Sequence, residues 1–519
     1  MWPGGGRAAM SDSPNLVFIW TDQQAYNTLG AYGNDRIETP NLDALAQRGR
    51  TFERAYCTSP VCGPSRSSVM TGKYSHTTGI TGNNIPLAPD DRTFAELVPD
   101  EYVCGWIGKW HLGDEIFRQR GFDEWVSTED QYHHFYGKDR PAHAHSDYHD
   151  FLLEHGYEPD QNDDGYRWFS REFVACNVPE EHSKPSFMAD AALDFIDRHR
   201  DEPFVLHVMF LEPHDPYASP RDDQYDPDEV PLPPNNDHAG MAEQPLRYRF
   251  AREVIRRGIS RRPPDEMGEP PSEDDWREVI SRYWGLVSLV DTHVGRILDE
   301  LDETGLVDDT ITVFTSDHGD MMGSHGLYTK MTQFEESVRV PLLLGIPDMT
   351  TPGERIEEPV SQIDLVPTLL DAMGLAIPET AGMQGTSWVP ELGGGSMNAA
   401  SPVVIEWNGA NFHGAFGRRA VEHPAAGRPG LTPEARALAE EMGLTEADVM
   451  TAYTDPARTL VTADGWKYTA RRSGEDELYH LGRDPYEQTN ELNTHHEIVR
   501  EKRAMIGNWQ VETRDPVYL

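Results

Sequence analysis

The sequence predicts an α/β fold in which a mostly parallel sheet is sandwiched by helices, with a smaller C-terminal α+β subdomain. Short apolar runs alternate along the chain with segments of helical periodicity, which is the pattern of strands and helices built around a parallel sheet. The pattern changes near Ser401, after which short strand-like pieces follow one another. A chain of 519 residues is long enough for about two to four domain-sized units.

The chain begins with a strand, a loop and a helix. Asn15 to Trp20 is an apolar run bounded by Pro14 and the polar Thr21, so we predict a buried strand with Asp22 at its carboxyl end. Residues 40–49 start with helix-initiating chemistry, carry apolar residues at helical spacing and close on a glycine, which predicts a helix.

The same patterns recur further along the chain. Buried strands are predicted at 102–107, 204–211, 310–315 and 341–345, and helices at 188–199, 276–301 and 361–373. Residues 215–273 are rich in Pro, Asp, Glu and Arg with little apolar periodicity, which predicts a long excursion over the surface.

Three regions are predicted. Residues 1–13 are expected to form a disordered extension, residues 14–400 the main domain and residues 401–519 the C-terminal subdomain. In that subdomain we predict strands at 403–407, 458–462, 466–470 and 477–481, and a terminal helix at 496–509.

Charge and composition exclude several classes of partner. With 45 basic and 88 acidic residues the net charge is −43, which argues against binding nucleic acid or an anionic membrane. No segment approaches the roughly 20 apolar residues that span a bilayer, and residues 1–14 contain no secretory apolar segment. Four cysteines are too few for a disulfide framework, so we expect a reducing, cytoplasmic location.

Polar side chains follow two of the predicted strands. Asp22 and Gln23 come after the first, and Asp317 and His318 after the strand at 310–315. Ligands of open α/β sheets bind outside the carboxyl ends of the strands, and carboxylate and amide oxygens suit a hard cation such as Ca²⁺ or Mg²⁺. Such pairs usually belong to turns or loops, so the prediction of a metal site depends on the motifs that accompany them.

Five short motifs occur in order along the chain. They are Thr-Asp-Gln at 21–23, Cys-Gly-Pro-Ser-Arg at 62–66, Gly-Lys-Trp-His at 108–111, Glu-Pro-His-Asp-Pro at 212–216 and Ser-Asp-His-Gly at 316–319. Together they resemble the type I sulfatases, which have an alkaline-phosphatase-like fold, and the resemblance covers roughly residues 14 to 390. It implies a sulfuric ester hydrolase acting on a sulfated small molecule, with a sulfated saccharide as the expected class.

The resemblance also implies a modified cysteine. A maturation enzyme would oxidise Cys62 to formylglycine, recognising Pro64 and Ser65, and the hydrated aldehyde would attack sulfur. The second hydroxyl of the hydrate would then allow sulfate to be expelled. Arg66 would fix this group and a metal cluster of Asp22, Gln23, Cys62, Asp317 and His318, with Ca²⁺ expected and Mg²⁺ or Mn²⁺ as alternatives.

Lysine is scarce, with seven residues among 45 basic ones, yet Lys109 and Lys330 lie in motif-like stretches. Because an ammonium and a guanidinium are not interchangeable at a crowded oxyanion site, these lysines are candidates for binding sulfate. By resemblance His111 contacts the formylglycine hydrate and His214 protonates the leaving oxygen. Weaker pocket candidates are His76, His325, Asn83 and Asn84.

Alternatives remain at the level of the sequence. Many arylsulfatases carry two or three acidic residues where this chain has Asp22-Gln23. Gln at that place also occurs in relatives that include phosphonate monoester hydrolases, so a phosphonate or phosphate ester is a rival substrate. A catalytically silent binding protein on the same scaffold is a second rival. Five histidines between 133 and 149 indicate either a second metal site or, as their irregular spacing favours, a solvated loop.

The acidic, lysine-poor composition favours adaptation to high salt over an ordinary acidic protein of a GC-rich organism. Because salt screens the repulsion between surface carboxylates, we expect unfolding midpoints to rise between low and molar KCl. A chain that is equally stable without salt would contradict this hypothesis.

Overall fold

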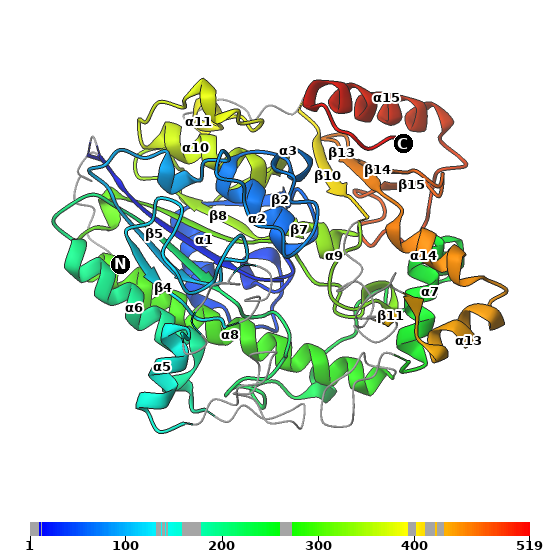
Figure 1. Cartoon of the computed structure of the whole chain (residues 1–519), viewed down its shortest axis with the longest axis horizontal. Coiled ribbons are helices and arrows are strands. Elements are labelled where there is room, and N and C mark those ends of the chain that lie inside the picture. Colours follow the sequence, from blue (N-terminus) through cyan, green and yellow to red (C-terminus); the bar gives the residue numbers. More distant parts are fainter. Residues whose placement is uncertain are drawn as a thin grey trace.

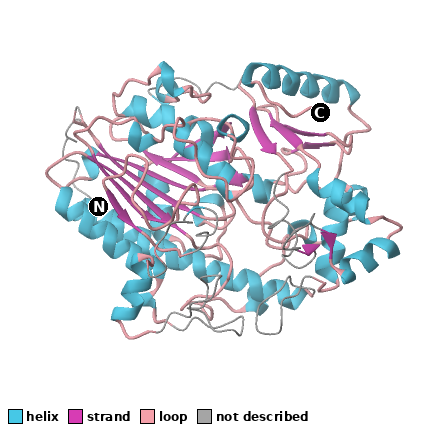
Figure 2. Ribbon diagram, viewed as in Figure 1, coloured by secondary structure: helices cyan, strands magenta, loops and turns pink. Residues whose placement is uncertain are grey.

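A large sheet forms the middle layer of the molecule, and helices cover both of its faces (Figures 1 and 2). The computed structural model describes residues 10–11, 13–130, 136, 141, 144–157, 178–259, 272–392, 401–409, 421–422 and 430–519. In Figure 1 a second, smaller sheet lies to one side, covered by the C-terminal helix α15.

The strands of the large sheet are β1 (Asn15–Thr21), β2 (Arg50–Tyr56), β3 (Val103–Gly108), β4 (Glu124–Val126), β5 (Phe204–Phe210), β6 (Thr310–Ser316), β7 (Arg339–Val340), β8 (Leu342–Gly345) and β9 (Glu354–Ser361). The smaller sheet contains β10 (Val403–Trp407), β13 (Ala457–Val461), β14 (Trp466–Arg471) and β15 (Glu477–His480), and β11 (Val421–Glu422) pairs with β12 (Gly430–Leu431).

The helices around the large sheet are α1 (Pro40–Arg48), α2 (Cys62–Thr71), α3 (Ser75–Thr78), α5 (Asp147–Glu154), α6 (Lys184–His199), α8 (Glu273–Glu303), α9 (Glu335–Val338), α10 (Leu365–Ala372) and α11 (Val389–Leu392). The others are α7 (Leu246–Arg256), α13 (Pro433–Glu441), α14 (Glu446–Thr454) and α15 (His496–Thr513).

Strand β1 is central and buried on both faces. Among the described residues the strand order is β4-β3-β5-β1-β6-β8-β2-β7, and β9 pairs with β2. Strand β1 runs parallel to both β5 and β6, and β3 runs parallel to β5, whereas β8 is antiparallel to β6. Parallel strands end at the same edge, so the loops after β1, β3, β5 and β6 converge there.

Alternation along β1 explains the three layers. Leu16, Phe18 and Trp20 pack in the core cluster that contains side chains of α2 and α10. Val17 and Ile19 point to the other face and pack in the cluster with α1, α6 and α8. Successive side chains of a strand point to opposite faces, so a continuous apolar run is what a doubly covered strand requires.

Most predicted elements are confirmed. The strands predicted from 15, 102, 204, 310 and 341 are β1, β3, β5, β6 and β8, and the helices predicted at 40–49, 188–199 and 276–301 are α1, α6 and α8. The strands and the terminal helix predicted after residue 401 correspond to β10, β13, β14, β15 and α15, and these four strands form an antiparallel sheet. The predicted extension at 1–13 lies mostly outside the described residues, although the backbone of Ser11 donates to Asp309 at 2.7 Å.

Three expectations need correction. The excursion at 215–273 contains α7, whose Tyr248, Phe250 and Val254 are buried, so that part is not a surface loop. The helix predicted at 361–373 is shorter, because Ser361 still belongs to β9 and α10 starts at Leu365. Strands β2 and β9 were not predicted, since charged residues within them interrupt the apolar pattern of a strand.

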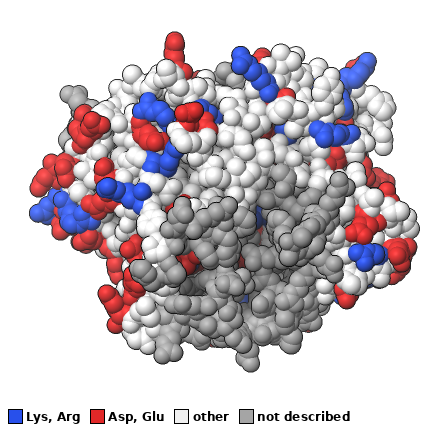
Figure 3. Space-filling view, viewed as in Figure 1, with Lys and Arg blue, Asp and Glu red and all other residues white. Residues whose placement is uncertain are grey.

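No helix in the described parts of the chain is both long enough and apolar enough to cross a membrane. On the face shown in Figure 3, acidic and basic side chains lie interspersed over the described surface.

A buried ion pair joins the smaller sheet to the main domain. Lys467 of β14 lies 2.9 Å from carboxylate oxygens of both Glu335 on α9 and Glu487, and all three side chains are at most 3% exposed. The backbone N–H of Glu335 also donates to Glu487 at 2.7 Å. Because two buried carboxylates share one ammonium, its loss would remove the nearest counter-charge of both and leave Glu335 with the Arg339 guanidinium at 3.9 Å.

We therefore expect Lys467→Met to lower the free energy of unfolding by about 3–5 kcal/mol, measured by urea denaturation. The matched control is Lys502→Met, because the partners Asp464 and Glu501 are 55% and 57% exposed and can be solvated when Lys502 is removed. That variant should lose about 1 kcal/mol or less. Equal losses in the two variants would contradict a structural role for the Lys467 cluster.

Candidate active site

The predicted motif residues meet at the carboxyl edge of the large sheet. Asp22 follows β1 and Asp317 follows β6, and Thr21 and Ser316 are partners in the register of those strands. Lys109 follows β3, and Cys62 is the first residue of α2. The two strand ends, the β3 loop and the start of one helix therefore supply the side chains of one site.

The sulfur of Cys62 lies at the centre of this site. Its neighbours are the Lys330 ammonium at 3.1 Å, Nε2 of His318 at 3.3 Å and a carboxylate oxygen of Asp22 at 3.7 Å. His111 is within hydrogen-bonding reach of the same sulfur. The Cys62 side chain is 1% exposed, so protein groups surround it completely.

A fully buried cluster of charged side chains lies next to Cys62. The Arg66 guanidinium donates to Asp22 at 2.7 Å and to Asp317 at 3.0 Å, and Lys109 donates to the same Asp22 oxygen at 2.7 Å. All four side chains have no exposed surface. The planar fork of an arginine presents several N–H donors in fixed directions, which suits the bridging of two carboxylates.

The electrostatics of the site favour negative charge on the side chain of residue 62. Burial alone would raise the pKa of the Cys62 thiol, but Lys330, Lys109 and His318 oppose it and hold that pKa well below its ordinary value. Burial likewise opposes ionisation of Asp22, yet Lys109, His214 and Lys330 bring the pKa of this carboxyl below its usual range. The site is therefore built to stabilise anions.

A metal ion could be held beside Cys62. Ligand atoms of Asp22, Cys62, Asp317 and His318 all lie within 4.8 Å of one another, and all four residues are buried. Two carboxylates and an imidazole, with the oxygen of Gln23 nearby, form a donor set that fits a hard divalent cation. The residues predicted as metal ligands are thus brought together.

Three residues close to this cluster, Tyr217, Asp320 and Glu115, were not predicted from the sequence. The Gln23 side-chain nitrogen contacts Asp320 and also donates to the Tyr217 hydroxyl at 3.1 Å, while the Gln23 oxygen accepts from Lys330 at 2.6 Å. Asp320 directly follows the Ser-Asp-His-Gly motif, so its position in the sequence could have predicted a place near the site. Nothing in the sequence pointed to Tyr217. The third residue is Glu115.

The segment from Lys109 to His111 forms a turn, because His111 has a φ of +60°. Glu115 holds this turn, since its two carboxylate oxygens accept the backbone N–H groups of Trp110 at 2.8 Å and His111 at 2.7 Å. Burial lowers the pKa of His111 to about 4, so its ring is neutral at pH 7.

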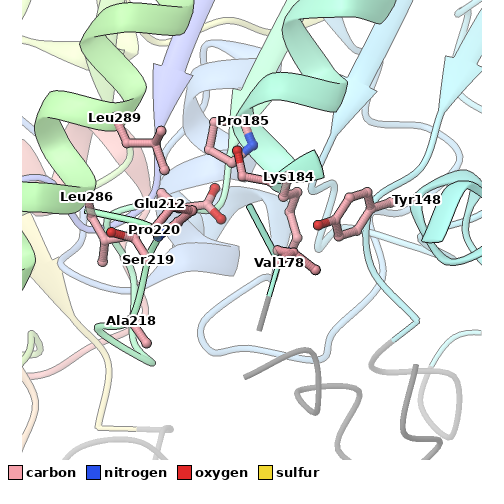
Figure 4. A pocket seen from close by; sticks show the side chains of 11 residues that line it. Tyr148, Val178, Lys184, Pro185, Glu212, Ala218, Ser219, Pro220, Leu286 and Leu289 are labelled. Carbon is pink, nitrogen blue, oxygen red and sulfur yellow. The ribbon is translucent and has the colours of Figure 1, made fainter. Parts of the chain in front are cut away.

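His214 lies at the edge of the cluster, and its Nδ1 is 2.7 Å from the carbonyl oxygen of Asp215. Glu212 of the same motif lines a separate pocket with Lys184 and Tyr148 (Figure 4). Burial raises the pKa of Glu212. The motif thus contributes to the site through His214, while Glu212 lines the pocket.

The weaker candidates divide into two groups. Asn83 accepts the backbone N–H of Gly63 at 2.8 Å, and Asn84 lies 3.4 Å from Nε2 of His111. His76 instead pairs with Glu406, and His325 with His238 at 2.9 Å, so the structure does not bring these two histidines to Cys62.

In the histidine-rich stretch, residues 133, 134 and 143 lie outside the described residues. The rings of His145 and His149 stack at 4.1 Å beside Asp130. His149 is buried on α5, so the prediction of a solvated loop is wrong for this residue.

A comparison with protein families agrees with this geometry. A family model described as Sulfatase matches residues 14–375, which is more than half of the chain. The chain belongs to the sulfatase family. This sulfatase is accordingly an enzyme that hydrolyses sulfate esters, and its fold is that of the alkaline-phosphatase-like superfamily.

Two relatives and one solved structure illustrate the similarity. The sulfatase is 31% identical over 416 residues to the choline-sulfatase of Rhizobium meliloti, covering 76% of this chain and 74% of the relative. It is 28% identical over 428 residues to the N-acetylglucosamine-6-O-sulfatase of Bacteroides thetaiotaomicron, covering 73% and 71%. A phosphonate monoester hydrolase from Silicibacter pomeroyi matches in fold with a TM-score of 0.75 and 22% identity, covering 97% of this chain and 96% of that one.

Glu115 generates a prediction about pH. Burial raises the pKa of Glu115 to about 7, above the roughly 4.3 of an unfolded chain. The folded state therefore binds more protons between these values, and its stability decreases as the pH rises through them. In urea denaturation, the stability of the wild type relative to Glu115→Gln should fall by up to roughly 3 kcal/mol between pH 5 and pH 8. A difference that stays constant with pH would contradict the buried, high-pKa carboxyl.

Proposed function

We propose that this sulfatase removes sulfate from a sulfated carbohydrate, with Cys62 matured to formylglycine as the nucleophile and a divalent cation, Ca²⁺ in the first instance, in the site. The names of its relatives support an organic sulfate ester as substrate, one of them a sugar sulfate and another choline sulfate. The chemistry around residue 62 supports the mechanism.

The observation that carries the proposal is the stabilisation of negative charge at the tip of residue 62. The Cys62 sulfur stands in for an oxygen of the formylglycine hydrate, and it lies 3.1 Å from Lys330 and 3.3 Å from His318. A nucleophilic oxygen at this position would be favoured in its ionised form by the same groups.

The cation would be held by Asp22, Gln23, Asp317, His318 and the modified residue 62. Bound there, a divalent ion acts as a Lewis acid that lowers the pKa of a hydroxyl and withdraws charge from a sulfate oxygen. Arg66 balances the charges of Asp22 and Asp317 through hydrogen bonds of 2.7 and 3.0 Å, which keeps their remaining lone pairs oriented.

Two lysines would bind the sulfate group. Lys330 is 6% exposed and Lys109 has no exposed surface, so both ammonium groups act in a medium where charge is weakly screened. Charge that develops on the sulfate oxygens in the transition state would be stabilised by these fixed cations. Lys109 and Lys330 are two of the seven lysines in the chain.

The histidines would move the protons. The Asp215 carbonyl oxygen can only accept a hydrogen bond, so Nδ1 of His214 carries a proton and Nε2 is the atom that can donate one to the leaving oxygen. The Asp215 carboxylate, 3.1 Å from Nδ1, stabilises the charged ring. His111, neutral at pH 7, can accept a proton from the nucleophile.

Gln23 favours a second candidate, the hydrolysis of a phosphonate or phosphate ester at the same site. A neutral amide in place of a carboxylate lowers the negative charge of the ligand set and thereby changes the balance between substrates of different charge. A silent binding protein on this scaffold is the remaining alternative, and it requires that Cys62 stay a thiol.

Peptide mass spectrometry of protein from the native host tests the mechanism. The peptide with Cys62 should be lighter by about 18 Da, because the thiol becomes an aldehyde, and Cys62→Ala should lose at least about 10⁴-fold in activity as expected for a missing nucleophile. The peptide with Cys104 is an internal control, since burial raises the pKa of that thiol. An unmodified Cys62 in active protein would refute the mechanism.

Hydrolysis of nitrophenyl sulfate and of the matching phosphonate monoester by the same preparation separates the two substrate classes. We expect the sulfate to react faster by orders of magnitude in kcat/KM, since differential binding of the transition state decides specificity. A screen of defined sulfated saccharides against choline sulfate would then identify the alcohol. Faster phosphonate hydrolysis would favour the second candidate.

A further inference from the structure

The side chain of Gln23 is held by a closed set of hydrogen bonds beside the candidate metal site. Its nitrogen donates to the Tyr217 hydroxyl at 3.1 Å and contacts Oδ2 of Asp320, and the Tyr217 hydroxyl donates to that same Oδ2 at 2.8 Å. The other Asp320 oxygen accepts the backbone N–H of Met322 at 3.0 Å. Gln23, Tyr217 and Asp320 are each at most 1% exposed.

These contacts determine which end of the amide faces Cys62. A primary amide is nearly symmetric in shape, so packing alone does not distinguish its oxygen from its nitrogen. A carboxylate acceptor on one side requires the nitrogen there, and the Lys330 ammonium, which can only donate, requires the oxygen on the other side at 2.6 Å. Both requirements are met by one orientation.

We infer that Asp320, assisted by Tyr217, is a positioning residue that presents the Gln23 oxygen to the metal ion. This inference rests on the proposed role of Gln23 as a metal ligand. If the Gln23 amide were rotated, its two N–H groups would point at the metal ion, which is repulsive. The amide nitrogen would also no longer face the Asp320 carboxylate. Hydrogen bonds of this kind orient the ligands of metal sites and tune their affinity.

The arrangement also explains how an amide can replace a carboxylate at position 23. A neutral ligand removes one negative charge from the direct surroundings of the cation. The Asp320 carboxylate lies one hydrogen bond further out, behind the Gln23 amide, where it polarises that amide and adds negative potential in a buried, weakly screened region. Gln23 and Asp320 therefore act as one unit.

An exchange of donor and acceptor tests this unit. In Gln23→Glu an oxygen replaces the nitrogen that faces Asp320, so two carboxylates meet in a buried place. In Asp320→Asn either orientation of the new amide brings its nitrogen against an N–H donor, that of Gln23 or that of Met322. The double variant restores a matched pair, because the amide nitrogen introduced at position 320 can donate to the carboxylate introduced at position 23, while the amide oxygen accepts from Met322.

Two measurements are made on EDTA-treated wild type and on the three variants: the thermal unfolding midpoint without metal, and the affinity for Ca²⁺ alone by titration calorimetry. We expect Asp320→Asn to bind Ca²⁺ roughly 10- to 100-fold more weakly than the wild type. We expect the midpoint of the double variant to lie above that of Gln23→Glu, with effects of the two substitutions far from additive.

Asp291→Asn is the matched control, because this buried aspartate accepts the backbone N–H of Leu42 at 2.8 Å at the start of α1. It should lower the unfolding midpoint and leave the Ca²⁺ affinity unchanged. Additive midpoints, or wild-type Ca²⁺ affinity in Asp320→Asn, would overturn the inference. A wild type that binds no Ca²⁺ would instead contradict the metal in the proposed function, and the metal-free midpoints would still decide how the amide is oriented.

Discussion

The pairing of Asp22 and Asp317 with Arg66 is the interaction on which the rest of the structure depends. Three charges without exposed surface tolerate burial only because each is hydrogen-bonded to an opposite charge. This pairing requires that β1 and β6 end in register and that α2 starts at the right distance from both. The apolar side chains of β1 point alternately to the two helical layers and fix the position of this strand in the sheet. Core packing and the ion pairs of Arg66 with Asp22 and Asp317 therefore require the same register of β1.

The charge of the site opposes the charge of the whole chain. Two carboxylates, Asp22 and Asp317, face three cations, Arg66, Lys109 and Lys330, within a protein of net charge −43. An anionic ester is therefore repelled at long range and attracted at short range. Long-range repulsion is screened by salt far more than contacts inside a buried site, so ionic strength acts on encounter more than on binding in the site.

The sequence was most informative where a pattern of residues has a single structural cause. Continuous apolar runs predicted β1, β5 and β6 because both faces of a central strand are covered, and short motifs at their ends predicted Asp22 and Asp317. Strand β2 was missed because its charged residues break the apolar run. His76 and His325 could not be placed, since an isolated histidine carries no sign of the partner, Glu406 or His238, that it meets in the fold. Glu115 acts through backbone N–H groups, which leave no trace in side-chain patterns.

The depth of α2 limits when the proposed modification of Cys62 could take place. Every residue from Cys62 to Arg66 is buried, and a side chain at Gly63 would come within 3.2 Å of Asn83 and Gly82. A second enzyme could reach this pentapeptide only while the helix is not yet docked against the sheet. Formation of the native core and oxidation of the cysteine would then be competing processes, and any change that accelerates folding would leave a larger fraction of chains with a thiol.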